Sequence, residues 1–150
     1  MKTVNRILFP VDLTESSDKL VPHVTTMVHK FEAQLHLLFV VRIFQYFSSI
    51  YVPHPSINLF ESELLEGARR RMNEFHDSHF KALSDVVDEV ILGDASETIL
   101  EYIANKQIDM VIMGTHGRKG LDRVIFGSVA ERVIKSSPVP VLVVNPYKIS

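Results

Sequence analysis

The amino-acid sequence predicts an α/β fold with a doubly wound sheet of five parallel strands and helices on both faces. Five short apolar runs occur along the chain, and segments with helical periodicity alternate with them. The clearest runs are continuously apolar, as is typical of strands covered on both faces. A length of 150 residues, 46% of them hydrophobic and 23% charged, suits one globular domain. We therefore expect a single domain over residues 1–150.

Composition excludes several classes of function. A net charge of only -2 provides no basic field for nucleic acid. The absence of cysteine excludes disulfides, thiolate metal sites and cysteine nucleophiles, and it fits a reducing compartment. The N-terminus has no signal-like apolar region, and no apolar run approaches the ~20 residues that cross a bilayer. We expect a cytoplasmic protein with neither nucleic acid nor membrane as a partner.

The first strand is expected over Val4–Val11, with Asp12 at its carboxyl end. Apolar residues then recur at helical steps: Leu20, Val24, Met27, Val28 and Phe31. Candidate caps for this helix are Thr14, Glu15, Ser16 and Ser17. Proline is comfortable only in the first turn of a helix, so Pro22 predicts an effective helix start near Asp18 or Lys19.

The second strand is expected over Gln34–Val41, which completes a right-handed βαβ unit. The aromatic and proline-rich segment Arg42–Asn58 is longer than most connections, which indicates a functional loop or an interface. Its aromatic residues either cover a ligand or pack against the next helix or a neighbouring subunit. The sequence does not separate these two interpretations.

A long amphipathic helix is predicted over Leu59–Leu83. It carries three consecutive arginines, 69–71, and the surrounding acids favour i,i+4 pairing over nucleic-acid binding. His76 and His79 could share a helix face and hold a metal ion, but no third ligand is evident. We interpret them as solvated histidines.

The third strand is expected over Val86–Leu92 and is followed by a helix over Ala95–Lys106, with Ser96 as its cap. The fourth strand is expected over Ile108–Met113 and the fifth over Val139–Val144. No repeat or linker interrupts this alternation of strands and helices.

A glycine-containing stretch follows the fourth strand. Gly114 and Gly117 allow backbone N–H groups to approach an anion, and Gly127-Ser128 opens a helix whose N-terminus favours negative charge. The spacing, GxxGx(9)GS, is neither that of the P-loop nor that of the dinucleotide fingerprint. A phosphate is the expected ligand. Arg118, Lys119 and Arg123 either screen it or are exposed charges.

This motif resembles the nucleotide-binding motif of the universal stress protein family. Further landmarks of the resemblance cover nearly the whole chain: residues 7–12, 37–41, 109–114 and 138–144. The resemblance implies a Rossmann-like sheet with strand order 3-2-1-4-5. The first and fourth strands would then be neighbours, and the ligand crevice would lie beyond their carboxyl ends.

The resemblance also implies roles for individual residues. Asp12 and the backbone near Val40 would hold adenosine, with Gly114 near the ribose and the Val129 amide among the phosphate ligands. The full nucleotide-binding set is Pro10, Val11, Asp12, Val40, Met113, Gly114, Gly117, Gly127, Ser128 and Val129. The alternative for Asp12 is a helix N-cap, and for the first two glycines of the motif it is a plain tight turn.

The function implied is that of an ATP-binding universal stress protein, a nucleotide-dependent switch in the stress response. ATP, ADP or AMP is the expected ligand, with Mg²⁺ as an optional companion. At most slow ATP hydrolysis is expected, because no general base is evident and His116 occupies a variable position of the motif. No catalytic residue and no protein metal ligand is assigned. The alternative is a homodimeric interaction module that binds no nucleotide.

Assembly is suggested by the last strand. Residues Val139–Val144 are apolar and would lie at a sheet edge, which needs a cover. The family covers this edge by antiparallel pairing with a second copy, so a homodimer is expected. Pro138 and Pro140 blunt the edge in part, and a monomer is the alternative.

Overall fold

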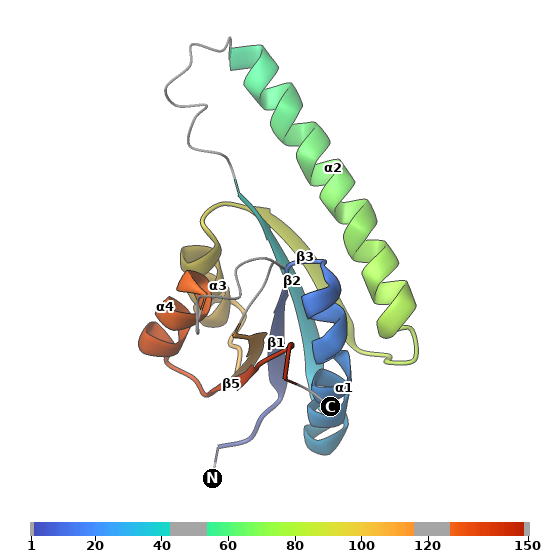
Figure 1. The fold of residues 1–150 in the computed structure, drawn as a ribbon, viewed down its shortest axis with the longest axis vertical. Coiled ribbons are helices and arrows are strands. Elements are labelled where there is room, and N and C mark those ends of the chain that lie inside the picture. The colour runs from blue at the N-terminus through green and yellow to red at the C-terminus, as the bar shows by residue number, and fades with distance from the viewer. Residues whose placement is uncertain (1, 43–53, 116–126, 149–150) are drawn as a thin grey trace.

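The computed structural model describes residues 2–42, 54–115 and 127–148. Within them one sheet of five parallel strands has the order β3-β2-β1-β4-β5 (Figure 1). The strands are β1 (Arg6–Val11), β2 (Gln34–Val41), β3 (Val86–Leu92), β4 (Met110–Gly114) and β5 (Val141–Val144). The predicted fold class and strand order are confirmed.

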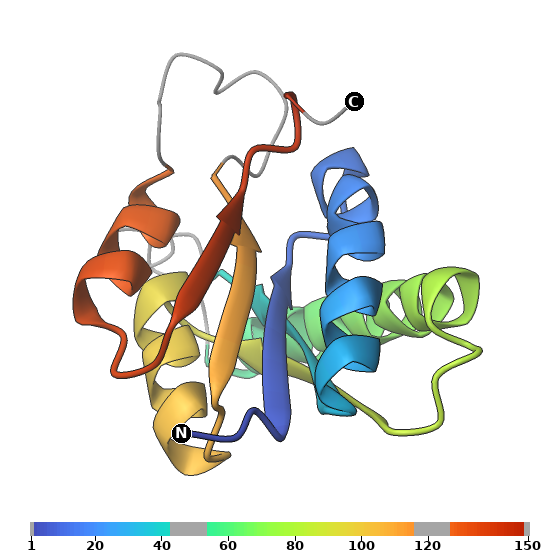
Figure 2. The same ribbon diagram turned by 90° about the horizontal axis from the view of Figure 1, so that it is seen from below.

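Two helices cover each face of the sheet, as Figure 2 shows. The helices are α1 (Glu15–Phe31), α2 (His54–His79), α3 (Ala95–Asn105) and α4 (Ser128–Ser136). In β1, Ile7 and Phe9 belong to the core beneath α1 and α2, whereas Leu8 belongs to the core beneath α3 and α4. All three side chains are almost completely buried, which explains why this strand lacks polar alternation.

The order of the strands reverses between β1 and β4. After β1 the chain runs outward through β2 and β3, and it then returns to place β4 on the other side of β1. The register joins Ile7 to Met110 and Leu8 to Val111. The carboxyl ends of β1 and β4 therefore lie side by side at the switch point, where open parallel sheets bind ligands.

Helix α1 begins at Glu15, so the predicted start near Asp18 or Lys19 is wrong. Thr14 is the N-cap, and its carbonyl accepts hydrogen bonds from two N–H groups of the first turn, Ser17 at 3.0 Å and Asp18 at 3.4 Å. Pro22 lies inside the helix on its exposed side, where the missing N–H costs one backbone hydrogen bond. Burial of the opposite face offsets that loss: Ser16, Ser17, Leu20, Val24 and Val28 are buried.

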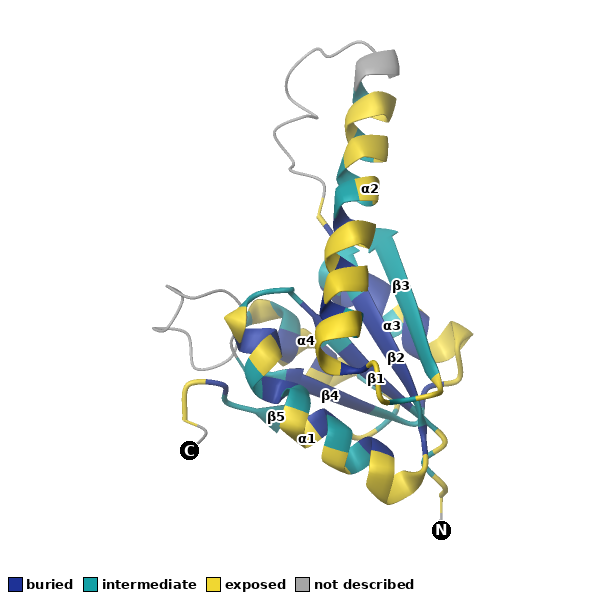
Figure 3. Cartoon of the chain, turned by 90° about the vertical axis from the view of Figure 1, so that its right-hand side faces the viewer, coloured by how far each residue is buried: buried dark blue, intermediate teal, exposed yellow. Residues whose placement is uncertain are grey.

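Helix α2 also differs from its predicted bounds, since it begins five residues before Leu59 and ends at His79 rather than Leu83. The ring of Phe80 is fully buried and lies 6.3 Å from the ring of Phe9, which directs the chain inward at that point. At its other end α2 extends beyond the sheet, with many exposed residues on it (Figure 3). The predicted loop is therefore shorter than Arg42–Asn58, and its residues 43–53 lie outside the described part of the chain.

Smaller differences occur at the starts of four other elements. The N-cap of α3 is Asp94 rather than Ser96, because the Asp94 carboxylate accepts the Glu97 N–H at 3.0 Å. The Asp109 side chain accepts the N–H groups of Asn5 and Arg6, at 2.9 and 3.0 Å. Strands β1, β4 and β5 each start two residues later than predicted. No helix in the described part of the chain has the length and apolarity to span a membrane.

Candidate functional site

The predicted site residues in the described segments gather at the carboxyl edge of the sheet. Pro10 and Val11 end β1, Asp12 follows directly, and Met113 and Gly114 end β4. Val40 is the penultimate residue of β2, the other neighbour of β1.

The start of α4 is tied to the same edge. The Gly127 N–H donates to the Thr115 carbonyl at 2.8 Å, and the Thr115 N–H donates to the Val144 carbonyl at 2.9 Å. Gly127, Ser128 and Val129 are thereby held close to the end of β4. Gly117 lies outside the described residues, as do His116, Arg118, Lys119 and Arg123.

Asp12 has two carboxylate oxygens in different environments. Its Oδ1 accepts three hydrogen bonds: from Thr14 N–H at 2.9 Å, from the Thr14 hydroxyl at 2.8 Å and from the Ser17 hydroxyl at 2.6 Å. The Asp12 N–H donates back to Ser17 Oγ at 2.9 Å. Its Oδ2 is buried and has no hydrogen-bond partner among the described residues. One oxygen therefore fixes the turn, while the other remains an acceptor without a donor.

The alternative role for Asp12 as a helix N-cap does not apply, because that position belongs to Thr14. A buried carboxylate oxygen without a donor is costly for a folded protein. Such an atom fits a ligand that brings its own N–H or O–H group. The sequence indicates Ser17 only as a candidate cap, whereas in the structure it hydrogen-bonds to Asp12.

The N-terminus of α4 presents backbone amides. Gly127 is its N-cap, and no side chain of the described residues accepts a hydrogen bond from the first turn. The first helical hydrogen bond runs from the Glu131 N–H to the Gly127 carbonyl at 3.0 Å. The amides of Ser128, Val129 and Ala130 precede it and have no intrahelical acceptor. They form a suitable anion-binding end, with the exposed Ser128 beside them.

Gly127 lies where α4 approaches the end of β4. Its φ of -59° is accessible to any residue. A Cβ atom at this position would lie 3.4 Å from the Thr115 carbonyl oxygen, which is close to an ordinary van der Waals contact. The position therefore leaves room for a small side chain such as alanine.

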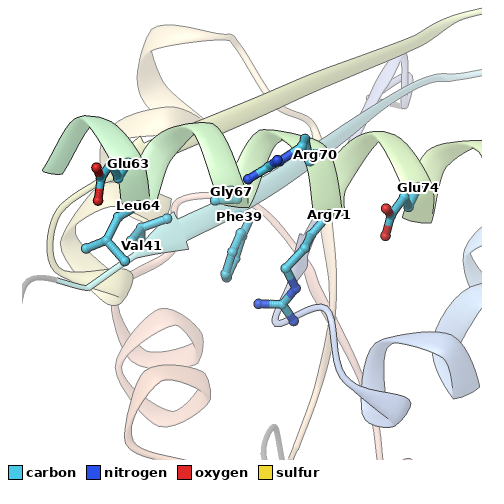
Figure 4. A pocket seen from close by; sticks show the side chains of 9 residues that line it. Phe39, Val41, Glu63, Leu64, Gly67, Arg70, Arg71 and Glu74 are labelled. Atoms are coloured by element: carbon cyan, nitrogen blue, oxygen red, sulfur yellow. The ribbon is translucent and has the colours of Figure 1, made fainter. Parts of the chain in front are cut away.

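Two cavities lie beside this edge, under α2. The larger, of about 570 Å³, is lined by Phe39, Val41, Glu63, Leu64, Gly67, Ala68, Arg70, Arg71 and Glu74 (Figure 4). A smaller cavity of about 240 Å³ is lined by Leu13, Asp18, Arg71, Glu74, Phe75, Ser78 and His79. Val40 belongs to neither, because it packs on the α3 and α4 side of the sheet. The cavities therefore adjoin the predicted crevice without including Asp12 or Gly114.

His76 and His79 of α2 contact carboxylates instead of being simply solvated. His76 Nδ1 lies 2.7 Å from Asp88 Oδ2 on β3, and His79 Nε2 lies 3.0 Å from Asp18 Oδ1 on α1. The described residues contain no group of three His, Asp or Glu side chains close enough to hold a metal ion. These histidines anchor the end of α2 to its neighbours.

The predicted i,i+4 ion pairs of arginines 69–71 do not occur in the described part of the chain. Instead, Arg71 Nη2 donates to the Leu13 carbonyl at 3.1 Å. Its guanidinium also lies 5.8 Å from the centre of the Phe39 ring. No pattern in the sequence signals a contact between residues 58 positions apart.

Comparisons with known proteins agree with this geometry. The model of the universal stress protein family matches residues 3–145. The universal stress protein MJ0531 of Methanocaldococcus jannaschii is 32% identical over 146 residues, which cover 95% of this chain and 83% of that protein. The solved structure of the M. jannaschii protein MJ0577 has a TM-score of 0.83 and 28% identity, and the match covers 96% of this chain and 97% of that one.

A more distant solved structure shares the fold. It is the universal stress protein from Archaeoglobus fulgidus in complex with dAMP, with a TM-score of 0.64 and 12% identity. The match covers 95% of this chain and 98% of that chain.

Proposed function

Because the chain belongs to the universal stress protein family, we propose that it binds ATP at the carboxyl ends of β1 and β4 and acts as a nucleotide-dependent switch in the stress response. The observation that carries the proposal is the buried, unpartnered Oδ2 of Asp12. Nucleoside hydroxyl and amino groups are donors of the kind that this atom lacks. The uncapped start of α4 supplies donors for phosphate at the same edge.

In this proposal different residues bind the nucleoside and the phosphates. Asp12 accepts from the nucleoside, beside the backbone of Val40 and the adjoining strand end of Pro10 and Val11. Met113 and Gly114 lie on the ribose side. The N-terminal amides of α4 bind the phosphates together with Ser128 and Gly117. ADP and AMP contain the same nucleoside and could bind in the same way. Any Mg²⁺ would be coordinated by the phosphates. The dAMP bound to the A. fulgidus protein supports an adenine nucleotide as the class of ligand.

Hydrolysis is expected to be slow at most. A fast hydrolase needs a positioned water and a group to accept its proton. Asp12 is the carboxylate at this edge, and its Oδ1 is occupied by three donors from the turn. The proposed site is thus better suited to holding a nucleotide than to turning it over.

The test uses Asp12→Asn. Asparagine retains Oδ1 for the Thr14 and Ser17 contacts and replaces the unpartnered oxygen with an NH₂ donor. Mass spectrometry of nucleotide released on denaturation, with calorimetric titration of ATP, is expected to show binding by the wild type and its loss in this variant. Glu15→Gln is the matched control, because it removes one nearby negative charge from an exposed side chain.

A wild-type protein that neither carries nor binds adenine nucleotide would refute the proposal. Equal binding by wild type and Asp12→Asn would show that Asp12 does not contribute to nucleotide binding. The homodimeric interaction module that binds no nucleotide is the function that would then remain.

We also propose a homodimer formed through β5. The two edges of the sheet differ: β3 carries Asp88 and Glu89, which contact His76 and Lys106, whereas β5 carries only valine and leucine. Charged side chains that point inward protect an edge strand from pairing. The apolar β5 lacks this protection, and antiparallel pairing with a second copy would satisfy its backbone groups.

The pairing can be tested at Val143. The carbonyls of Pro140 and Val144 accept hydrogen bonds from the N–H groups of Val111 in β4 and of Thr115 just after it, so the backbone groups of Val143 face the open edge. Val143→Pro removes an outward N–H and is expected to give monomers, whereas Val143→Thr retains the N–H and the dimer. Light scattering at micromolar concentration measures the mass. A monomeric wild type would contradict the proposal.

A further inference from the structure

The turn that presents Asp12 is strained at Leu13. Leu13 has a φ of 60°, in the left-handed region that residues other than glycine rarely adopt. It lies between Asp12 and Thr14, whose N–H and hydroxyl both donate to Asp12 Oδ1. The left-handed backbone at Leu13 is therefore part of the geometry that leaves Asp12 Oδ2 without a donor. Strain of this kind persists only where surrounding groups hold it.

Arg71 is the group from another element that holds this turn. Its Nη2 donates to the Leu13 carbonyl at 3.1 Å, and its guanidinium lies 5.8 Å from the Phe39 ring centre. Figure 4 shows the Arg71 side chain leaving α2 beside the Phe39 ring, while Arg70 lies along the helix near Gly67. The aromatic ring of β2 thus fixes the direction of the arginine that reaches the β1–α1 turn.

We infer that Arg71 is a positioning residue for nucleotide binding, which it supports by holding the left-handed Leu13 turn so that Asp12 Oδ2 stays available to the ligand. This inference rests on the proposed function. The arginine acts through the Leu13 carbonyl and needs no contact with the nucleotide. A charged donor gives a stronger hydrogen bond than a neutral one, which suits a strained acceptor.

A general electrostatic attraction between α2 and phosphate is the competing explanation, and Arg70 separates the two. Arg70 and Arg71 are neighbours, both are exposed, and both line the larger cavity. Of these two arginines, only Arg71 hydrogen-bonds to the Leu13 carbonyl in the described part of the chain. Long-range attraction predicts equal effects of the two arginines, whereas positioning predicts an effect of Arg71 alone.

The experiment measures ATP affinity by calorimetry for the wild type, Arg71→Ala and Arg70→Ala, with thermal unfolding as a check that each variant is folded. Arg71→Ala is expected to weaken binding about tenfold, the effect of losing one charged hydrogen bond. Arg70→Ala is expected to retain the wild-type affinity. Equal weakening by the two variants would overturn the inference.

The effect of Arg71→Ala is measured again in a protein that carries Leu13→Gly. Glycine adopts a positive φ without strain. With Gly at position 13 the turn no longer depends on the arginine, so adding Arg71→Ala should change the affinity little. This loss of additivity is the signature of an effect transmitted through Leu13. If Arg71→Ala costs the same in both backgrounds, the arginine acts by another route and the inference fails.

A second readout needs no nucleotide. Hydrogen exchange of the Thr14 amide, which donates to Asp12 Oδ1, is expected to be faster in Arg71→Ala than in Arg70→Ala. Unchanged exchange would contradict the role of Arg71 in the turn. A wild type without ATP binding would refute the proposed function, whereas a binding wild type with unaffected Arg71→Ala would refute this inference alone.

Discussion

The Nδ1 atom of His36 lies 2.7 Å from the hydroxyl oxygen of Tyr102, inside a buried polar network that joins β2 to α3. The His36 Nε2 atom lies 2.8 Å from Gln34 Oε1, and the Gln34 amide group donates to Asp85 Oδ1 at 2.8 Å. The Gln34 oxygen faces Nε2, which assigns the proton to that nitrogen, and Nδ1 faces the Tyr102 hydroxyl, which also hydrogen-bonds the Glu89 side chain. The network therefore uses a neutral imidazole.

His36 predicts a pH dependence of stability. Burial, with further contributions from Arg6 and Lys106, lowers the pKa of His36 below its ordinary value of 6.5, although Glu89 and Asp85 act in the opposite direction. The unfolded chain therefore takes up a proton before the folded one as pH falls. The contribution to stability is complete above pH 6.5 and is lost as pH decreases below it.

Urea unfolding at several pH values between neutrality and mild acidity checks this prediction. His36→Gln removes the titrating group, so its free energy of unfolding should fall less steeply with acidification than that of the wild type. Other titrating groups contribute equally to both proteins. Parallel slopes for the two would show that His36 does not control the response.

Tyr102→Phe should destabilise the fold. The side chain is only 3% exposed, and removing its hydroxyl leaves His36 Nδ1 buried without a donor. The expected cost is about 1–3 kcal/mol in the free energy of unfolding. Tyr147→Phe is the matched control, because that ring is 37% exposed and its hydroxyl lies 3.3 Å from Ser16 Oγ. A cost at position 147 as large as that at 102 would argue against burial as the cause.

Gly93→Ala should also destabilise the fold. A Cβ atom there would lie 2.8 Å from Thr98 Oγ1, which is on a buried and stiff side chain. The overlap should cost about 1–3 kcal/mol, and adding Thr98→Ala should relieve part of it. Gly67→Ala is the control in α2, where the new Cβ would be 4.0 Å from Arg70 Nη2. That change should stabilise the helix by about 0.5–1 kcal/mol, as thermal unfolding would measure.

Asp94→Ala should remove the cap of α3. The carboxylate accepts from Glu97 N–H and the Ser96 hydroxyl, and these bonds lower the pKa of Asp94 below 3.8. We expect the free energy of unfolding to fall by about 1 kcal/mol at neutral pH. Asp94→Asn should retain most of the stability that the cap contributes. The carboxylate's contribution should disappear as pH falls through 3.8 and below, because the folded pKa is the lower one. A variant as stable as wild type at pH 7 would refute the capping role.

Much of the fold follows from local patterns in the sequence. The β-branched and apolar residues of β2 and β3 predict both strands with their observed ends, Gln34–Val41 and Val86–Leu92. The glycine spacing correctly anticipates a helix that opens at Ser128 and a strand that ends beside it. These predictions succeed because buried strands and helix starts depend on residues a few positions apart.

Other features required the folded chain. The proline rule places the start of α1 too late, because burial of the helix face near Ser16 and Leu20 outweighs the hydrogen bond that Pro22 cannot make. Similarly, the end of α2 is set by burial of Phe80 and not by the helical pattern that continues toward Leu83. Tertiary packing overrides local propensity at both positions.

Local patterns along the chain are enough to predict the succession of strands and helices, the parallel sheet and the two segments that carry the candidate site. The different environments of the two Asp12 oxygens and the contact between Arg71 and Leu13 arise only in the folded chain. The reason is physical: periodicity and capping act within a few residues, whereas a contact across 58 positions forms only when the sheet has brought α2 over the end of β1.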